Sequence, residues 1–244
     1  MERTVHLSLV IPAYNEEHRI GETMRHVLDY LKAQPYDAEV IVVDDGSIDA
    51  TQRIVEAFRS AEVPAVSVVS LPENRGKGYA VYTGMSQARG AYRVFYDADA
   101  STPIEELGRL WPRFEAGADV VIGSRERPDS DVQVRQRWYR QTMGRVFNVF
   151  LRLLGITRFK DTQCGFKGFS ARACDVVFPR QTIHRFSFDA ELLYIAQKHG
   201  LRVDEVPVCW RNSSRSRVHP LFDASRMLFD LLTIRAKDIL GRYA

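Results

Sequence analysis

Short apolar runs alternate with amphipathic segments through the first hundred residues of the chain. Four runs have the length and the aliphatic content of buried strands, at 7–12, 39–44, 66–71 and 91–96. The segments between them predict helices over 16–32, 49–58 and 78–88, and Asp49 is the predicted N-cap of the second. Strands that alternate with helices in this way predict parallel βαβ units with helices on both faces of one sheet.

Two amphipathic stretches follow in the second half of the chain. Residues 135–154 interleave arginines with aromatic and aliphatic side chains, and 221–239 carry a second apolar pattern. Such helices suit a bilayer interface, although packing on the domain with solvated arginines explains the same pattern. We predict one α/β domain over 1–212 and a C-terminal amphipathic helical tail over 213–244 packed on it.

Composition and charge narrow the functional classes. The chain has 244 residues, 45% hydrophobic and 27% charged, with a net charge of only +3, which is typical of an ordinary globular protein. Residues 135–160 nevertheless hold seven Arg or Lys residues and no acid, at positions 135, 137, 140, 145, 152, 158 and 160. No recognisable nucleic-acid-binding module accompanies this basic stretch, so we expect no nucleic-acid partner.

The absence of targeting signals suggests a location. No apolar run reaches the roughly 18 residues that span a bilayer, and the first residues lack the apolar region of a signal peptide. Three cysteines without C-x-x-C spacing indicate reduced, mostly buried thiols. We therefore expect a cytoplasmic protein that contacts the cytoplasmic membrane face only peripherally.

Polar side chains collect where the predicted strands end. Asp97 and Asp99 follow the fourth strand, and two hard carboxylates at the carboxyl edge of a sheet suit Mg²⁺ or Mn²⁺ carried by a phosphate-bearing substrate. An acidic pair is also common in solvated turns. Pro12 and Gly46 predict tight turns after the first two strands, and Asp44 is placed to contact a ribose or base.

The loop Glu73-Asn74-Arg75-Gly76-Lys77-Gly78 follows the third strand. It lacks Walker A spacing, but it brings two glycines and two cations to a helix N-terminus, where anions are favoured. A helix start with solvated cations is the alternative. For Asp45 and Ser47 the alternative is turn and capping chemistry, and for Asp161 and Asp189 it is an N-cap or core-edge hydrogen bond.

The order of these motifs resembles one enzyme family. P-A-Y-N-E, V-D-D-G-S, E-N-R-G-K-G and D-A-D, followed by G-S-R at 123–125 and D-T-Q-C-G-F-K at 161–167, resemble the inverting family 2 glycosyltransferases of GT-A fold. Within that family the likeness is nearest to the dolichyl-phosphate and polyprenyl-phosphate sugar synthases. D-T-Q-C-G-F-K with F-D-x-E-L-L at 188–193 resembles the glucosyltransferases more than the mannose synthases. The resemblance implies a Rossmann-like α/β fold with a mostly parallel mixed sheet.

The resemblance also implies roles for individual residues. A nucleotide-sugar site would include Pro12, Tyr14, Glu16, Asp44, Lys77, Asp97, Ala98 and Asp99, with the metal on Asp99 and Asp97. Arg125 and Arg140 would bind the acceptor phosphate. The catalytic set implied by the family, together with our own candidate Asp161, is Asp99, Arg125, Arg140, Asp161, Arg211 and Arg217. Asp161 and Asp189 are candidates for orienting groups near the acceptor.

The chain departs from the family pattern at a few of these positions. Ser101 stands where a third metal ligand is expected, Gly144 replaces an expected Ser, and Ser214 and Arg217 replace Gly and Lys of the late loop. The implied function is metal-dependent transfer of a hexose, first glucose from UDP-glucose, to a dolichyl or polyprenyl phosphate at a membrane surface. The alternatives are mannose from GDP-mannose, transfer to a soluble or protein acceptor, and a sugar-nucleotide-binding or scaffold protein without turnover.

Overall fold

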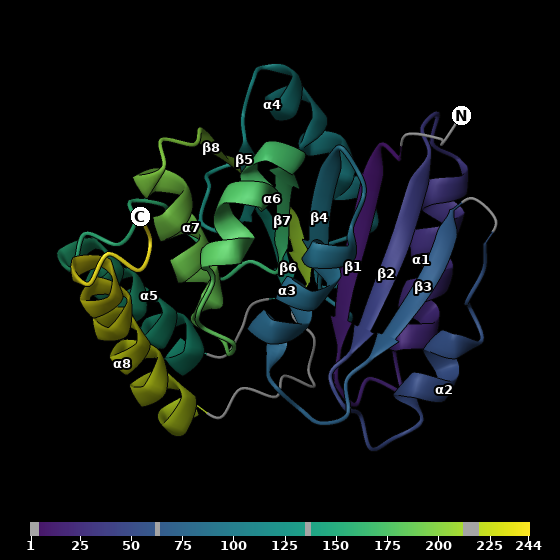
Figure 1. Cartoon of the computed structure of the whole chain (residues 1–244), viewed down its shortest axis with the longest axis horizontal. Coiled ribbons are helices and arrows are strands. Elements are labelled where there is room, and N and C mark those ends of the chain that lie inside the picture. The colour runs from purple at the N-terminus through teal and green to yellow at the C-terminus, as the bar shows by residue number, and fades with distance from the viewer. Residues whose placement is uncertain (1–4, 62–63, 135–137, 212–219) are drawn as a thin grey trace.

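A seven-stranded sheet forms the centre of the molecule (Figure 1). The computed structural model describes residues 5–61, 64–134, 138–211 and 220–244, without the side chains of 134, 138–143, 145 and 220–226. The strands run in the order β3-β2-β1-β4-β7-β5-β8. Their bounds are β1 Leu7–Ala13, β2 Ala38–Asp44, β3 Ala65–Ser70, β4 Tyr92–Tyr96, β5 Val120–Ser124, β7 Phe166–Ser170 and β8 Val203–Pro207. Only β7 runs antiparallel to its neighbours within this sheet. A small second sheet pairs β6 (Asp131–Val134) with β9 (Cys209–Arg211).

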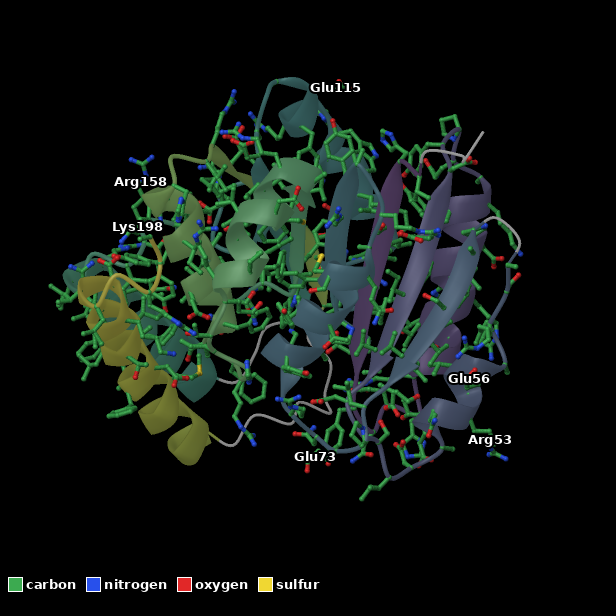
Figure 2. All side chains as sticks on the ribbon, in the orientation of Figure 1. Arg53, Glu56, Glu73, Glu115, Arg158 and Lys198 are labelled. Atoms are coloured by element: carbon green, nitrogen blue, oxygen red, sulfur yellow. The ribbon has the colours of Figure 1, made fainter. Side chains whose placement is uncertain are left out.

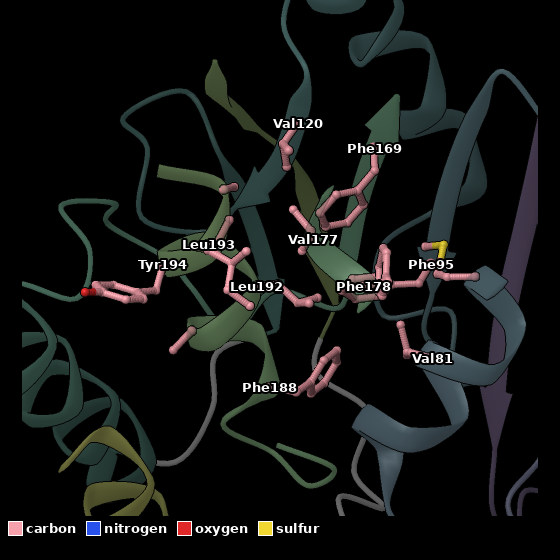
Figure 3. Close-up of a cluster of buried hydrophobic side chains, with 14 of the residues drawn as sticks. Val81, Phe95, Val120, Phe169, Val177, Phe178, Phe188, Leu192, Leu193 and Tyr194 are labelled. Atoms are coloured by element: carbon pink, nitrogen blue, oxygen red, sulfur yellow. The ribbon is translucent and has the colours of Figure 1, made fainter. Parts of the chain in front are cut away.

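Helices cover both faces of the sheet. They are α1 Ile20–Lys32, α2 Thr51–Glu56, α3 Lys77–Gln87, α4 Trp111–Glu115, α5 Trp138–Leu153, α6 Ala171–Val177, α7 Phe188–Lys198 and α8 Pro220–Ile239, with short 3₁₀ turns η1 Ile104–Arg109 and η2 Phe178–Arg180. One core packs α1 against β1 and β2, and the other packs α3, α6 and α7 against the opposite face. Figure 3 shows Phe95 and Phe169 of the sheet close to Phe178 and Phe188 in this second core.

The alternation of strand and helix patterns predicted β1 to β4 and α1 to α3, with two local differences at helix starts. The first helix begins at Ile20 and not at residue 16, because residues 17–19 form a separate turn. The second helix begins at Thr51 with Ala50 in the N-cap position. The Asp49 carboxylate still accepts the Thr51 N–H at 2.9 Å, and it also accepts that of Glu17 at 3.3 Å. Asp49 therefore joins two loops as well as supporting the start of a helix.

The prediction of a tight turn at Pro12 was wrong. Pro12 is buried within β1 and pairs with Val43 of β2. A proline is tolerated there because the ladder from β1 to β4 ends at the pair Val10 and Phe95, so β4 needs no N–H from residue 12. Gly46, in contrast, does occupy a left-handed turn, with φ of 70°.

The two predicted amphipathic helices lie side by side as α5 and α8 (Figure 1). Each buries one apolar stripe in the second core, with Phe147 and Leu151 from α5 and Leu231 and Ile234 from α8. In the described residues, no helix combines the length and the apolar character that crossing a membrane requires. The predicted division at 212/213 falls in the segment 212–219, outside the described residues.

Candidate active site

One edge of the sheet gathers the predicted functional residues. Strands β1, β2, β4 and β5 all end at this edge, and β7, which is antiparallel, begins there. The strand arrows of β1, β2 and β3 point to it at the bottom of Figure 1, and Figure 2 shows Glu73, from the loop after β3, on the same side. The loops at 14–17, 45–50, 71–76 and 97–101, and the segment 161–165, therefore meet in space.

The loops after β1 and β2 are joined by hydrogen bonds. The Asn15 N–H donates to the Ser47 hydroxyl at 2.8 Å, and the Glu16 N–H donates to the Thr51 hydroxyl at 2.6 Å. The Ser47 hydroxyl in turn bonds to the buried Asp44 carboxylate. Asn15 has a φ of 52°, an unusual backbone conformation that the surrounding bonds hold in place. Ser47 thus builds the loop, as the turn interpretation proposed.

Asp45 has a structural task. Its carboxylate accepts the N–H groups of Arg75 and Gly76, each at 2.8 Å, and the side-chain amide of Asn74 at 2.9 Å. Burial raises the pKa of Asp45 despite these bonds. This carboxylate therefore fixes the turn that leads into α3. The turn sets the position of Lys77, the first residue of α3.

Asp97 and Asp99 lie in the loop directly after β4, and each faces a cation of the chain. Lys77 Nζ is 2.5 Å from Asp97 Oδ1, and Arg19 Nη1 is 3.7 Å from Asp99 Oδ2. The loop is held by the Thr23 hydroxyl, which donates to the Ala98 carbonyl at 2.8 Å. Ala100 has a φ of 49°, a second strained position at this edge. The sequence predicted the two acids and Lys77 at one site, and the structure brings them together.

The carboxylates fit a divalent ion that arrives with a diphosphate. Burial, followed by the nearby Asp97, raises the pKa of Asp99, so this carboxyl gains from a cation that compensates both effects. Asp99 Oδ1 accepts the Ser101 N–H at 3.0 Å, which orients the group. The described residues contain no group of three or more Asp, Glu, His or Cys side chains able to hold a metal by themselves. Mg²⁺ is commonly bound by one or two carboxylates, and phosphate oxygens and water complete its coordination.

Segment 161–167 and the start of α7 form the wall behind these acids. Gly165 lies so close to Asp97 that a Cβ at this position would overlap the carboxylate. The fully buried Lys167 pairs with Asp189 Oδ1 at 2.5 Å and donates to the Cys164 carbonyl. Burial raises the pKa of Asp189, although Lys167 and Lys77 oppose the shift. Asp189 is therefore part of a buried charge network behind the site.

The half-buried Arg125 and the buried Asp161 form another ion pair at the same edge. Arg125 Nε and Nη2 donate to the two Asp161 oxygens at 2.7 and 2.8 Å, and the Arg125 N–H adds a bond of 2.9 Å. Desolvation opposes the ionised carboxyl, but Arg125 outweighs it and lowers the pKa of Asp161 to about 2. The geometry makes Asp161 an orienting group for Arg125, since a carboxylate held ionised in this way is a weak base.

The structure describes some of the predicted arginines more fully than others. Arg211 lies in β9, where its N–H donates to the Ser101 carbonyl at 2.8 Å and its Nε donates to Gln133 at 2.6 Å. It is thereby attached to the loop 97–101 after β4, which we call the metal-site loop because the sequence predicts a metal on its two acids. The side chain of Arg140 in α5 and all of Arg217, with Ser214, lie outside the described residues. Gly144 is exposed on α5.

The remaining nucleotide-site predictions surround the same edge. Tyr14 is half-buried in the loop after β1, and the Glu16 carboxylate pairs with Arg19. Pro12, Asp44 and Ala98 are buried. Their roles toward a nucleotide sugar stay predictions.

Sequence reasoning missed Arg19 and Gly165 as parts of the site. Arg19 falls in the segment predicted as the first helix, where a cation among polar residues is typical of a solvated face. The sequence did contain one indication that Arg19 belongs to the site: it lies three residues after Glu16, which is part of the first motif. Gly165 belongs to the recognised D-T-Q-C-G-F-K motif, but nothing in the sequence connects it with Asp97.

Comparisons with known proteins decide the family. The model of the family described as "Glycosyl transferase family 2" matches residues 8–178. The chain belongs to this family. It is 33% identical over 248 residues to the dolichyl-phosphate beta-glucosyltransferase of Dictyostelium discoideum, covering 97% of this chain and 76% of that protein. The protein of the same name from Homo sapiens is 34% identical over 257 residues, covering 98% and 78%. The prediction of a family 2 glycosyltransferase is confirmed, and the protein is a glycosyltransferase.

Solved structures match the whole architecture of this glycosyltransferase. Mannosyl-3-phosphoglycerate synthase from Rubrobacter xylanophilus has a TM-score of 0.70 at 20% identity, covering 98% of this chain and 75% of that one. Glucosyl-3-phosphoglycerate synthase from Mycobacterium tuberculosis, in complex with Mn²⁺, UDP and glucosyl-3-phosphoglycerate, has a TM-score of 0.66 at 21% identity, covering 99% of this chain and 80% of that one. At these identities the likeness concerns the fold. The predicted GT-A, Rossmann-like α/β domain with a mostly parallel mixed sheet is confirmed.

Proposed function

We propose that this enzyme transfers glucose from UDP-glucose to dolichyl phosphate or a related polyprenyl phosphate, with inversion at the anomeric carbon and with Mg²⁺ or Mn²⁺. The observation that carries the proposal is the meeting of Asp97, Asp99 and Lys77 at the edge that also holds the Arg125–Asp161 pair. The names of relatives that are 30–34% identical over nearly the whole chain support glucose and a dolichyl acceptor. The Mn²⁺ and UDP bound by a structural neighbour support the donor side.

The chemistry asks for stabilisation of a developing anion. An oxygen of the acceptor phosphate forms a bond to the anomeric carbon while the bond to the UDP oxygen breaks, so negative charge moves onto the diphosphate. A bound divalent ion held by Asp99, with Asp97 beside it, would supply Lewis-acid stabilisation of that leaving group. Lys77 lies next to these carboxylates and adds a cation for the same phosphates.

No strong general base is needed for this reaction. A phosphate monoester has a second pKa of about 6, so the acceptor is largely ionised near neutral pH. Arg125 then binds the acceptor phosphate through the edge of its guanidinium that Asp161 does not occupy. Asp161 orients this arginine through two hydrogen bonds and keeps its own negative charge throughout the reaction.

We propose a membrane-facing surface on α5 and α8. Each helix has a second apolar stripe that points away from the core, with Val146, Val149, Phe150 and Leu153 on α5 and Phe229, Leu232 and Ile239 on α8, all between 41% and 80% exposed. The exposed Arg152 directly precedes Leu153 of the α5 stripe, and the exposed Arg158 and Lys160 follow α5 in the chain. Figure 2 shows Arg158 at the outer edge of the molecule. Exposed apolar side chains bordered by cations suit an anionic bilayer interface, where a lipid phosphate acceptor is found.

Donor turnover tests the proposed function. Purified protein with Mn²⁺ or Mg²⁺ and a short polyprenyl phosphate is incubated separately with UDP-glucose and with GDP-mannose. We expect a metal-dependent glucolipid from UDP-glucose alone, reduced at least about a hundredfold by Asp99→Ala. Glu115→Ala, an exposed acid at the opposite end of the molecule (Figure 2), is the matched control with unchanged turnover. Product from GDP-mannose alone, or none from either donor, would contradict the proposal.

A further inference from the structure

Both carboxylates of the metal-site loop are already paired with cations of the chain. Lys77 Nζ is 2.5 Å from Asp97, and Arg19 Nη1 is 3.7 Å from Asp99. The four side chains are between 19% and 31% exposed, so water screens the pairs only in part. In this state Lys77 neutralises Asp97 directly, whereas Asp99 shares the charge of Arg19 with Glu16.

Separate elements build the two cations into the site. Lys77 opens α3, and its approach is fixed by Gly76, whose φ of 102° lets the backbone pack against the His184 carbonyl. The Tyr79 N–H donates to that same carbonyl at 3.1 Å. Arg19 comes from the turn before α1. The backbone that carries Lys77 is therefore held by contacts outside the ion pair.

The two cations differ in their freedom to move. Arg19 is engaged with Glu16, to which its Nη2 donates at 2.8 Å and its Nε also donates. Lys77 carries a compact charge on a flexible stem. Its ammonium group lies 2.5 Å from Asp97 Oδ1 and its side chain is about a quarter exposed, so it can reach a ligand that arrives from solvent. Lys77 is the cation that can change partners.

The geometry points to Lys77 as an exchangeable counter-ion, which holds Asp97 in the empty site and moves to the diphosphate when the donor binds. This role rests on the proposed nucleotide-sugar function. A divalent ion that arrives alone finds Asp97 already paired with Lys77 and is repelled by the charges of Lys77 and Arg19. A diphosphate gives Lys77 a new anionic partner and frees Asp97 for the ion. Metal and nucleotide therefore bind cooperatively, and each increases the affinity for the other by the same factor.

Two binding measurements on Lys77→Gln test the exchange. We expect Mn²⁺ without nucleotide, followed by titration calorimetry or the EPR signal of the free ion, to bind the variant at least about tenfold more tightly than the wild type. We expect UDP without metal to bind at least about tenfold more weakly, because a phosphate cation is lost. The two changes have opposite signs, whereas a merely structural defect weakens both.

Two further variants serve as controls. Lys77→Arg keeps the charge and is expected to leave the affinity for Mn²⁺ alone low. Arg59→Gln removes a cation from the exposed pair with Glu56, outside the site, and is expected to leave both affinities unchanged.

Unchanged or weaker binding of Mn²⁺ alone to Lys77→Gln would overturn the proposal and leave Lys77 as a simple phosphate ligand. Neither measurement requires sugar transfer. An exchange observed in a protein that makes no glucolipid would refute the proposed function and keep this inference. If the protein instead makes a glucolipid but binds metal and nucleotide independently, the proposed function stands and this inference is refuted.

Discussion

Gly165 and Asp97 are so close that any side chain at position 165 would overlap the Asp97 carboxylate. The two residues are also joined through the backbone, because the Asp97 N–H donates to the Gly165 carbonyl at 3.2 Å. The contact arises where antiparallel β7 begins beside the end of β4. The position of the Asp97 carboxylate thus depends on the absence of a side chain at the residue just before β7.

We expect Gly165→Ala to displace the Asp97 carboxylate and to reduce UDP binding in the presence of Mn²⁺ at least about tenfold. The φ of Gly165 is not in the left-handed region, so an alanine fits the backbone and the effect concerns the carboxylate. Titration calorimetry measures the change. Gly108→Ala, where a Cβ would meet nothing within 4 Å, is the matched control. If Gly165→Ala and Gly108→Ala bound UDP with equal affinity, the Asp97 carboxylate would be able to shift without any loss of UDP binding.

We expect Asp161→Asn to lower the free energy of unfolding by about 2 kcal/mol at neutral pH, since the pKa of Asp161 falls from its ordinary 3.8 to about 2 in the folded protein. A carboxyl with a lowered folded pKa stabilises the protein at pH values above its unfolded pKa. The difference from wild type should therefore shrink as the pH falls from about 4 to about 2. Urea unfolding over a pH series measures it. Glu56→Gln breaks an exposed pair that water screens, and although Arg59 lowers the pKa of Glu56 as well, this variant should show a much smaller trend.

The Tyr243 hydroxyl donates to Glu191 Oε1 at 2.6 Å and joins the C-terminal segment to the start of α7. Glu191 also accepts the N–H groups of Thr182 and Ile183, at 3.0 and 2.8 Å. We expect Tyr243→Phe to cost about 1.5 kcal/mol of stability, since it removes one hydrogen bond to a buried carboxylate. Urea denaturation measures the cost. Tyr82→Phe, at a half-buried tyrosine whose hydroxyl makes no bond among the described residues, should cost much less.

We expect Leu153→Glu combined with Phe229→Glu to abolish binding to vesicles that contain anionic phospholipid. These side chains are 76% and 67% exposed, so the change removes apolar contact without touching the core. Vesicle co-sedimentation measures binding. Ile48→Glu, at an exposed apolar residue just before α2 on the far side of the sheet, is the control. Retained vesicle binding with a change from dimer to monomer would instead assign this surface to a second copy of the chain.

Much of the fold could be predicted from local patterns. The four N-terminal strands and the three helices between them follow from apolar periodicity, and their parallel order places Asp44 and Asp97 at one edge. Pro12 was misread because a proline usually marks a turn. Here it lies in a strand, just beyond the point where one neighbour stops pairing. That boundary depends on the length of β4 and cannot be inferred from residues near position 12.

The sequence alone determined the alternation of strands and helices, the acid pair after β4 and the membership of a glycosyltransferase family, because these depend on residues near one another in the chain. Only the tertiary structure decided which cation faces which acid. Lys77, the first residue of α3, meets Asp97, and Arg19, in the turn before α1, meets Asp99. Gly165 meets Asp97 because β7 inserts antiparallel between β4 and β5. The physical reason is that packing between distant segments sets these distances, and no local pattern encodes them.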